Sequence, residues 1–346
     1  MSDAIKCLVW DLDNTMWSGT LVESGACRLR PGMRDVLRRL DRRGILLSIA
    51  SLNDPDQALP VLRRKRIDGY FLHPQIGWGN KVNSLRAIAS RLGVALDAVG
   101  FVDDEPYERE RVLRMLPAVR VYPAAAYREL TRRPEFHPGA LSAESRARRL
   151  KYQQAESREE ARESMGISHG EFLRYANMRL ALRRAARGDV PRILELLRRT
   201  HQLNSTGVIY GPDAVRAWLR DPRYAVFVAE LEDRFVDYGR IGVAVCRRRA
   251  KEWELVSFLL SCRVLSRGIS GYVLAWVEQQ AARHGAEQFL ARYRANERNR
   301  RMQALYGLAG LKPTGVLPDG TQLFGGAPRR TIQPPRWLSI ADGTIS

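Results

Sequence analysis

Two carboxylates stand one residue apart at the end of an apolar segment near the start of the chain. Asp11 and Asp13 follow KCLVW (residues 6–10), a run that predicts a buried strand. Because side chains alternate along an extended chain, this spacing points both carboxylates the same way. One carboxylate can then attack phosphorus while the other protonates the leaving oxygen, provided that cations offset the repulsion between anions. Taken alone, the same pair could equally close a solvated turn.

Further polar residues occur at the ends of other predicted elements, in an order that suits the same chemistry. They are Ser51 after ILLSIA (45–50), Lys81 in a loop that opens a helix, and Asp103 and Asp104 after AVGFV (98–102). A hydroxyl and an ammonium group can hold a phosphate, and carboxylate and carbonyl oxygens suit Mg²⁺. The backbone carbonyl of Asp13 would complete that oxygen shell. The whole set favours a phosphate-processing site over an isolated turn.

The segments around these residues alternate between strand and helix patterns. Strands are predicted over 6–10, 45–50, 68–72 and 98–102, and helices over 33–43, 54–66 and 82–92. Such alternation predicts an α/β fold with a parallel, doubly wound sheet, which binds its ligands at the carboxyl ends of the strands. The candidate residues all lie at that edge.

Composition and charge limit the possible classes of protein. The chain has 346 residues, 45% of them hydrophobic, which predicts two domains with separate cores. Its net charge is +19, mostly from scattered arginine pairs, so the surface is either simply solvated or docks an acidic partner. Without a dense basic block we expect no nucleic-acid partner, and without a long apolar segment no membrane partner. Four cysteines without metal-binding spacing indicate a reducing, cytoplasmic location.

A change of character in the middle of the chain predicts a domain boundary. We expect a first domain over 1–135, a solvated helical linker over 136–175, a second domain over 176–318 and an extended tail over 319–346. The second domain should contain a strand and a helix within 180–204, strands over 224–234, 240–248 and 252–262, a helix from 267 to 283, a strand over 287–293 and a helix over 299–311. A turn around 237–239 should join the first two strands of that series.

The acidic motifs resemble those of the haloacid dehalogenase (HAD) superfamily of aspartate-nucleophile phosphotransferases. The segments around these motifs are similar to the FkbH-like subfamily of that superfamily. They are IKCLVWDLDNTMWSGTLVESG, HPQIGWGNKVNSLRAIASRLGV and VGFVDDEPYERERV. That resemblance implies Mg²⁺-dependent transfer of a glyceryl unit from 1,3-bisphosphoglycerate to an acyl carrier protein, in polyketide-type biosynthesis. Roughly 40 residues separate the first two motifs, so we expect no large cap domain.

The resemblance also implies roles for individual residues. Asp11 would be the nucleophile and Asp13 the general acid and base. The residues that contact phosphate would be Asn14, Thr15, Ser51, Asn53 and Lys81, and those that hold Mg²⁺ would be Asp11, Asp13, Asp103 and Asp104.

The second half of the chain resembles the GNAT acyltransferase fold, and LSCRVLSRG and NERNRRMQALYGLAG also match the FkbH-like pattern. In that fold the amides at a helix start bind the pyrophosphate of acyl-CoA. Here the loop lacks the first basic and last small residue of the acetyltransferase pattern, so carrier recognition is the expected role. The candidates for contacting the pantetheine arm are Cys262, Arg263, Arg267, Gly268, His201 and Asn204.

One departure from the FkbH-like pattern leaves the reaction open. Ala50 stands where glyceryl loaders commonly carry a cysteine before the motif-two serine, and Cys7 reads as a core residue. Loss of that thiol favours an alternative function, a phosphatase that acts on a phosphorylated and possibly carrier-bound intermediate. A third alternative is a scaffold without catalysis that docks carrier proteins, which the complete acidic motif set argues against.

Overall fold

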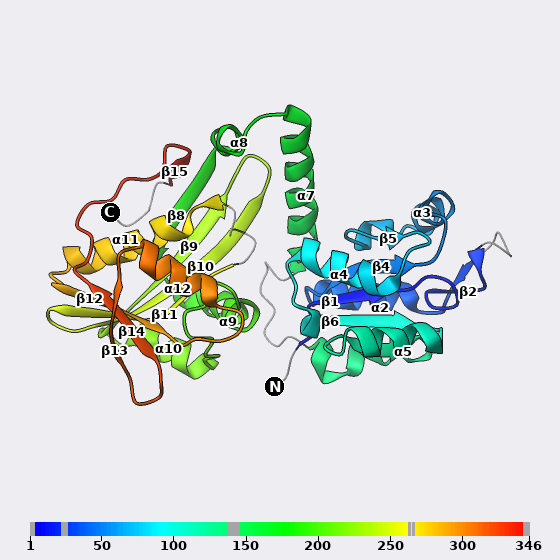
Figure 1. Ribbon diagram of the computed structural model, residues 1–346, viewed down its shortest axis with the longest axis horizontal. Coiled ribbons are helices and arrows are strands. Elements are labelled where there is room, and N and C mark those ends of the chain that lie inside the picture. Colours follow the sequence, from blue (N-terminus) through cyan, green and yellow to red (C-terminus); the bar gives the residue numbers. More distant parts are fainter. Residues whose placement is uncertain (1–3, 22–26, 138–145, 262–263, 265–266, 342–346) are drawn as a thin grey trace. The chain divides into compact units, whose positions relative to one another are not determined.

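The structure is a computed structural model that describes residues 4–21, 27–137, 146–261, 264 and 267–341 (Figure 1). The chain forms two compact units, Met1–Gln153 and Gln154–Ser346, here called unit 1 and unit 2. The α/β class predicted from the sequence is confirmed, because unit 1 holds a parallel sheet and unit 2 a second sheet, each with helices. No helix in the described ranges combines the length and hydropathy that crossing a bilayer requires.

Unit 1 is built on five parallel strands in the order β5-β4-β1-β6-β7. These are β1 (Cys7–Trp10), β4 (Leu46–Ser51), β5 (Gln75–Ile76), β6 (Val99–Asp103) and β7 (Arg120–Pro123). From the central β1 the chain adds β4 and β5 on one side, and then β6 and β7 on the other. The order therefore reverses between β1 and β6, and open α/β sheets bind ligands at such a reversal.

Helices cover both faces of this sheet. They are α2 (Met33–Arg42), α3 (Pro55–Arg64), α4 (Lys81–Leu92) and α5 (Pro106–Met115). Leu8 and Trp10 of β1 pack in the cluster that includes α2 and α3, whereas Cys7 and Val9 pack in the cluster with α4 and α5. This alternation explains why KCLVW is apolar throughout: both faces of the central strand are buried.

Two details of unit 1 differ from the sequence prediction. The strand expected over 68–72 is wrong: those residues form the short 3-10 helix η1 (Asp68–Tyr70), and Phe71 makes only one isolated bridge, to Leu47. The apolar residues at the end of this segment suggested a strand. The Asp and Gly that precede them favour a turn instead, and the turn forms. The edge strand β5 forms instead at Gln75–Ile76, and a small hairpin, β2 (Trp17–Ser18) with β3 (Arg28–Leu29), follows β1.

The connecting helix α7 (Arg148–Met165) is less solvated than its charged sequence suggested. Within unit 2, Arg158 is only 1% exposed, its Nε lies 2.6 Å from Asp233 Oδ2, and its guanidinium stacks over the Phe172 ring. Within unit 1, the Tyr152 hydroxyl donates to the carbonyl of Leu92. The unit boundary falls inside α7, which is followed by α8 (His169–Ala176), so this segment belongs to both units and is not a separate linker.

Unit 2 contains an eight-stranded sheet in the order β13-β14-β12-β11-β10-β9-β8-β15. The strands are β8 (Met178–Arg184), β9 (Tyr224–Glu232), β10 (Asp237–Arg248), β11 (Glu252–Leu260), β12 (Gln288–Tyr293), β13 (Lys312–Val316), β14 (Gln322–Gly326) and β15 (Leu338–Ile340). The helices are α9 (Val190–Arg199), α10 (Pro212–Arg220), α11 (Ser270–Arg283) and α12 (Arg300–Leu308).

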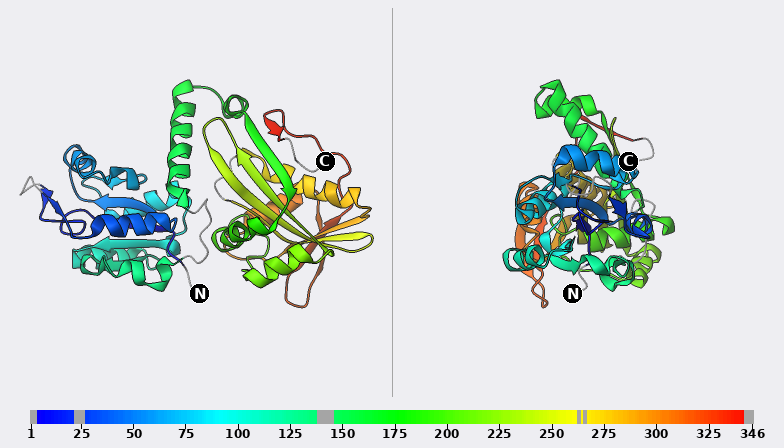
Figure 2. Two further views of the ribbon diagram at one scale, coloured as in Figure 1. Left: turned by 180° about the vertical axis from the view of Figure 1, so that it is seen from behind. Right: turned by 90° about the vertical axis from the view of Figure 1, so that its right-hand side faces the viewer.

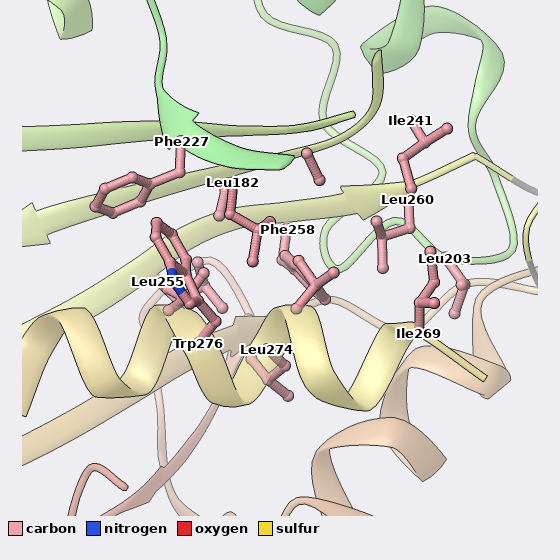
Figure 3. Packing of buried hydrophobic residues seen from close by; sticks show 14 of the residues in the cluster. Leu182, Leu203, Phe227, Ile241, Leu255, Phe258, Leu260, Ile269, Leu274 and Trp276 are labelled. Atoms are coloured by element: carbon pink, nitrogen blue, oxygen red, sulfur yellow. The ribbon is translucent and has the colours of Figure 1, made fainter. Parts of the chain in front are cut away.

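Helices also cover both faces of this second sheet. Leu274 and Trp276 of α11 pack against Phe227, Leu255 and other strand residues on one face, as Figure 3 shows. Helices α9 and α10, in green in Figure 2, pack with the apolar residues of the opposite face. Unit 2 therefore has two buried layers that do not depend on unit 1.

Two further expectations for unit 2 need correction. The segment expected as an extended tail contributes β14 and β15 to the sheet, and Phe324 and Leu338 are buried there. Its Gly and Pro residues hid these short strands, because they interrupt the apolar pattern on which a strand prediction depends. The expected turn around 237–239 lies within β10, which starts at Asp237 and is irregular there, and Asp233 caps the real turn by accepting from the amides of Phe235 and Val236.

Candidate active site

Strand register brings the two acidic motifs together at the reversal point of the unit 1 sheet. Trp10 of β1 pairs with Val102 of β6, and the amide of Asp11 donates to the carbonyl of Val102 at 2.9 Å. Asp11 and Asp103 therefore emerge side by side from the carboxyl ends of adjacent strands. Ser51 ends the neighbouring strand β4, and α4 begins at Lys81, after its N-cap Asn80.

A buried ion-pair and hydrogen-bond network joins these residues. Lys81 Nζ lies 2.9 Å from Asp11 Oδ1 and 2.6 Å from Asp103 Oδ2. The hydroxyl of Ser51 donates to Asp11 Oδ1 at 2.9 Å, and the side-chain Nδ2 of Asn53 donates to the Ser51 hydroxyl oxygen at 3.1 Å. All five residues are buried, although two of them are carboxylates and one is an amine. Buried charges at this density are costly unless they are paired, so removal of Lys81 would leave buried charge uncompensated.

The loop after β6 is fixed by contacts from two other segments. The Thr15 hydroxyl donates to Asp104 Oδ1 at 3.1 Å and accepts from the Asp104 amide at 3.0 Å, while the Glu105 amide donates to Asp103 Oδ1 at 2.8 Å. Arg109 Nη1 donates to the backbone carbonyls of Asp103 and Asp104, at 3.0 and 2.5 Å. Arg109 was not predicted from the sequence; its only signal there is a cation one helical turn into α5, facing the carbonyls that precede the helix.

Burial and mutual repulsion shift the proton affinities of this network. Burial raises the pKa of Asp11 to about 6; Lys81 opposes this rise and Asp103 adds to it. Burial also raises the pKa of Asp103, against the opposing effect of Lys81. For Lys81, burial alone would lower the pKa, but attraction to the two carboxylates raises it overall. Lys81 therefore stays charged, while the carboxylates lack enough positive charge to keep them fully ionised.

The donor set fits a hard divalent cation. Carboxylate oxygens of Asp11, Asp103 and Asp104 all lie within 4.8 Å of one another. With Lys81 they carry a formal charge of −2, which a dication would neutralise. All three ligand atoms are oxygens, the type that Mg²⁺ selects.

Asp13 is placed differently from the other predicted metal ligands. Its carboxylate accepts from the indole Nε1 of Trp17 at 2.7 Å and from the amide of Leu21, and it does not belong to the group of carboxylates that could hold a metal ion. The prediction of metal binding through Asp13 therefore finds no support from its side chain. Trp17 positions Asp13, the candidate acid and base.

Asn14 and Thr15 serve the structure of this loop. Asn14 has a left-handed backbone (φ 48°), its side chain accepts from the Gly19 amide, and its carbonyl accepts from the Arg30 guanidinium. Thr15 is fully buried against Asp104. Both residues were predicted to contact phosphate, but in this structure their polar groups hold the segment that carries Asp13.

The unit 2 candidates that lie within the described residues do not form a comparable site. Asn204 is 1% exposed; its side chain donates to the Thr200 carbonyl and accepts from the amides of Thr206 and Gly207. Its backbone carbonyl accepts from the side-chain Nδ2 of Asn299. Asn204 is thus committed to a buried turn, and the neighbouring His201 lies half-buried just after Thr200.

The chain itself fills the fork between β11 and β12. These parallel strands pair only from Glu252 to Leu255, and beyond that the segment 203–205 takes the partner's place on β11. The Ser205 amide donates to the Phe258 carbonyl, and the Leu260 amide donates to the Leu203 carbonyl, both at 2.9 Å. A pantetheine arm that added to this edge as an extended chain would find these groups already bonded, so the residues present do not fit acyl-CoA in the fork.

The loop before α11 is also occupied by the chain. Arg267 is buried, and its Nη2 donates to the Tyr238 hydroxyl at 3.1 Å. Gly268 has φ +68°, and a Cβ there would lie 3.2 Å from the ring of Trp337. Both residues were predicted to contact the pantetheine arm; in the structure Arg267 faces the interior and Gly268 lies next to an aromatic ring. Cys262 and Arg263 lie outside the described residues.

Comparisons with known proteins find solved structures that are similar to parts of this chain. No protein-family model matches the chain, and no curated protein matches its sequence. The N-terminal part of the protein BF1531 from Bacteroides fragilis, which contains a phosphatase domain complexed with Mg, is 27% identical, with a TM-score of 0.33. That match covers 37% of this chain and 39% of that one, so this chain spans well under half of that structure.

Two acetyltransferases are also similar in structure. The ribosomal-protein-S18-alanine N-acetyltransferase from Escherichia coli is 14% identical over 48% of this chain and 99% of that one, with a TM-score of 0.35. The spermidine N-acetyltransferase from Vibrio cholerae, solved with CoA and spermine, is 14% identical over 43% of this chain and 95% of that one, with a TM-score of 0.34. At such scores the function has to be argued from the site itself.

Proposed function

We propose that this protein is a Mg²⁺-dependent phosphotransferase in which Asp11 is the nucleophile. The proposal depends on one observation above all: Lys81 bridges Asp11 and Asp103 in a buried network, beside a third carboxylate on Asp104. An ammonium group between two carboxylates has little structural value, since apolar residues of the same volume would stabilise a core as well or better. It does suit the binding of a phosphate next to an aspartate that must attack it.

The proposed reaction has two steps. In the first, an Asp11 oxygen bonds to phosphorus, the bond from phosphorus to the leaving oxygen breaks, and Asp13 gives that oxygen a proton. In the second, an acceptor attacks the phosphorus of the aspartyl phosphate, Asp13 takes the acceptor's proton, and the Asp11 carboxylate is restored. Ser51 and Lys81 would hold phosphate oxygens during both steps. Mg²⁺, held by Asp11, Asp103 and Asp104, would supply the positive charge that lets two anions approach.

The finer proposal follows the FkbH-like resemblance. The donor would be 1,3-bisphosphoglycerate, in polyketide-type biosynthesis. The phosphopantetheine thiol of an acyl carrier protein would attack carbon 1 and displace its phosphate, and the 3-phosphate would pass to Asp11 and then to water, which leaves a glyceryl thioester and two phosphates. Between β1 and β4 the described residues hold only the β2–β3 hairpin and α2. A site without a large cap there would admit a substrate presented by a bulky carrier.

Hydrolysis is the second candidate, and the cysteines favour it. All three described cysteines are buried, at Cys7, Cys27 and Cys246. Burial raises the pKa of Cys7 to about 12 and that of Cys246 still further, so neither forms a thiolate at neutral pH. An acyl relay through Cys7 or Cys246 is therefore disfavoured, which supports hydrolysis over acyl transfer.

One experiment separates the two candidates. The protein is incubated with 1,3-bisphosphoglycerate, Mg²⁺ and a holo carrier protein, and the carrier is weighed by intact mass spectrometry while released phosphate is measured. A glyceryl adduct supports transfer, and phosphate release alone supports hydrolysis. The Asp11→Asn variant should abolish both; if it does not, the proposed nucleophile is wrong.

A further inference from the structure

An exposed tryptophan lies close to the candidate active site. Trp78 is 74% exposed, the largest value for a large apolar side chain in the described part of unit 1. A Cβ placed on Gly77 or Gly79 would meet no described atom within 4 Å beyond its own neighbours in the chain, so little packs around this loop. A tryptophan stabilises a fold mainly by being buried, and this one is not. Its exposure therefore points to a role in binding.

The backbone holds this tryptophan next to the residues that would clamp a phosphate. The Gly77 amide donates to the carbonyl of Ser51 at 3.1 Å, and the Ser51 hydroxyl donates to Asp11. Trp78 directly follows Gly77 and lies three residues before Lys81, a stretch that spans at most about 11 Å between Cα atoms. The indole and the Lys81 ammonium group thus start from points close enough for one ligand to contact both.

A second exposed apolar side chain starts from the neighbouring strand. Leu52 directly follows Ser51 and is 38% exposed. Ser51 pairs with Ile76 at the carboxyl ends of β4 and β5, so Leu52 and Trp78 both follow these ends at the same edge of the sheet. The charged site therefore has an apolar border on the side of β4 and β5.

The size of this border decides what it fits. A stable protein interface needs about 20–30 residues on each side, and this border has only Leu52 and Trp78. It does fit the organic group of a ligand whose phosphate lies at Asp11, because the phosphate fixes one end of that molecule beside the indole. A flat apolar group gains most from such a contact, since aromatic rings stack on one another.

We propose that Trp78 determines substrate specificity: the site takes phosphate monoesters whose organic group carries an aromatic ring, which stacks on the indole with Leu52 beside it. The proposal rests on the proposed Mg²⁺-dependent phosphoryl transfer and adds the substrate class. It favours the second candidate function, because a three-carbon acid offers the indole little apolar surface.

Calorimetry on the full chain with Mg²⁺ tests this specificity without turnover. The probes are 2-phenylethylphosphonate and ethylphosphonate, which differ only in the phenyl ring and whose C–P bonds the proposed reaction does not cleave. We expect the phenyl compound to bind about tenfold tighter, the size expected for one aromatic contact. Trp78→Ala should abolish that preference and Trp78→Phe should keep part of it. Leu113→Ala, which removes an exposed apolar side chain from α5, is the control and should leave the preference unchanged.

Fluorescence gives an independent readout of the same contact. Five of the seven tryptophans are buried and Trp337 is partly buried, so acrylamide should quench mainly Trp78. The phenyl compound should protect this signal, and ethylphosphonate should not. Equal binding of the two phosphonates, or a phenyl preference that survives Trp78→Ala, would overturn this proposal alone. Failure of both phosphonates to bind would instead refute the phosphate site, and with it the proposed function on which this inference rests.

Discussion

Lys81 is the residue whose removal tests the physical argument for the active site most directly. Its ammonium group is the only cation in direct contact with the buried carboxylates of Asp11 and Asp103 among the described residues. Lys81→Met keeps much of the side-chain volume but leaves both carboxylates without a cationic partner. Breaking a buried ion pair in this way costs about 3–5 kcal/mol of the free energy of unfolding. We expect a loss of that size at pH 8 without divalent cations.

The loss should shrink in acid, because a proton can replace the missing charge. The pKa of Asp11 is already raised to about 6, well above its ordinary value of 3.8, and the substitution raises it further. The folded variant then binds a proton that the unfolded chain releases, so its stability falls as pH rises above about 4. Stability falls by about 1.4 kcal/mol for each pH unit between the ordinary pKa and the raised folded pKa, so the variant goes on losing stability above pH 6, where Asp11 of the parent protein no longer contributes a slope. At pH 5 we therefore expect the loss to be about half as large.

Urea unfolding at pH 5 and pH 8, with and without Mg²⁺, measures these quantities. Adding Mg²⁺ should restore stability to the variant more than to the parent protein, because the variant's site carries one more negative charge. Lys251→Met is the matched control: Lys251 is exposed and pairs with Glu287 at 2.7 Å, so its loss should cost less than about 1 kcal/mol. A loss in Lys81→Met that does not depend on pH, or that only equals the control, would refute the reasoning.

Three other substitutions test single contacts. Thr15→Val removes the hydroxyl that fixes Asp104 and should weaken Mg²⁺ binding by about 10–100-fold in calorimetry. Trp17→Phe keeps the ring but removes the donor to Asp13, so kcat for a phosphate ester should fall while Mg²⁺ affinity stays the same. Burial raises the pKa of Glu278 to about 7, so this group's contribution to stability falls as pH rises from about 4.5 to 7. Glu278→Gln should remove that slope and stabilise the protein by about 1–3 kcal/mol at pH 8, measured by urea unfolding.

The central part of unit 1 could be predicted from the sequence because the local patterns of apolar and capping residues agree with the order of the strands in the sheet. The apolar run before Asp11 is buried on both faces, the helices start at capping residues such as Asp54 and Asn80, and the motif spacing matches the strand ends. Parallel strands leave little freedom in where such residues lie, so Asp11, Ser51 and Asp103 had to meet at one edge. This is why the main carboxylate and lysine group could be predicted without any knowledge of tertiary contacts.

The sequence did not show which side chains hold the loops, because residues of similar chemistry serve either function or structure. Asn14, Thr15 and Asn204 were predicted to contact substrate, and in the structure their polar atoms satisfy buried backbone and loop groups. A sequence does not show which hydrogen bonds a buried amide makes, because its partners come from distant segments. The same holds for β15, which forms only because β8 offers an edge 160 residues earlier in the chain.

Under the proposed function, the charge of the site would give Lys81 two tasks. Without a metal, Lys81 is needed to offset Asp11 and Asp103, and even so burial raises the pKa of both carboxyl groups. With a dication bound among Asp11, Asp103 and Asp104, most of that need disappears, and the ammonium group becomes available to an incoming phosphate. The site would therefore bind its anionic substrate well only after it has bound its metal. Binding of a phosphate analogue such as vanadate should consequently be weak without Mg²⁺ and should strengthen by orders of magnitude with it, whereas metal-independent binding would show that Lys81 is not shared in this way.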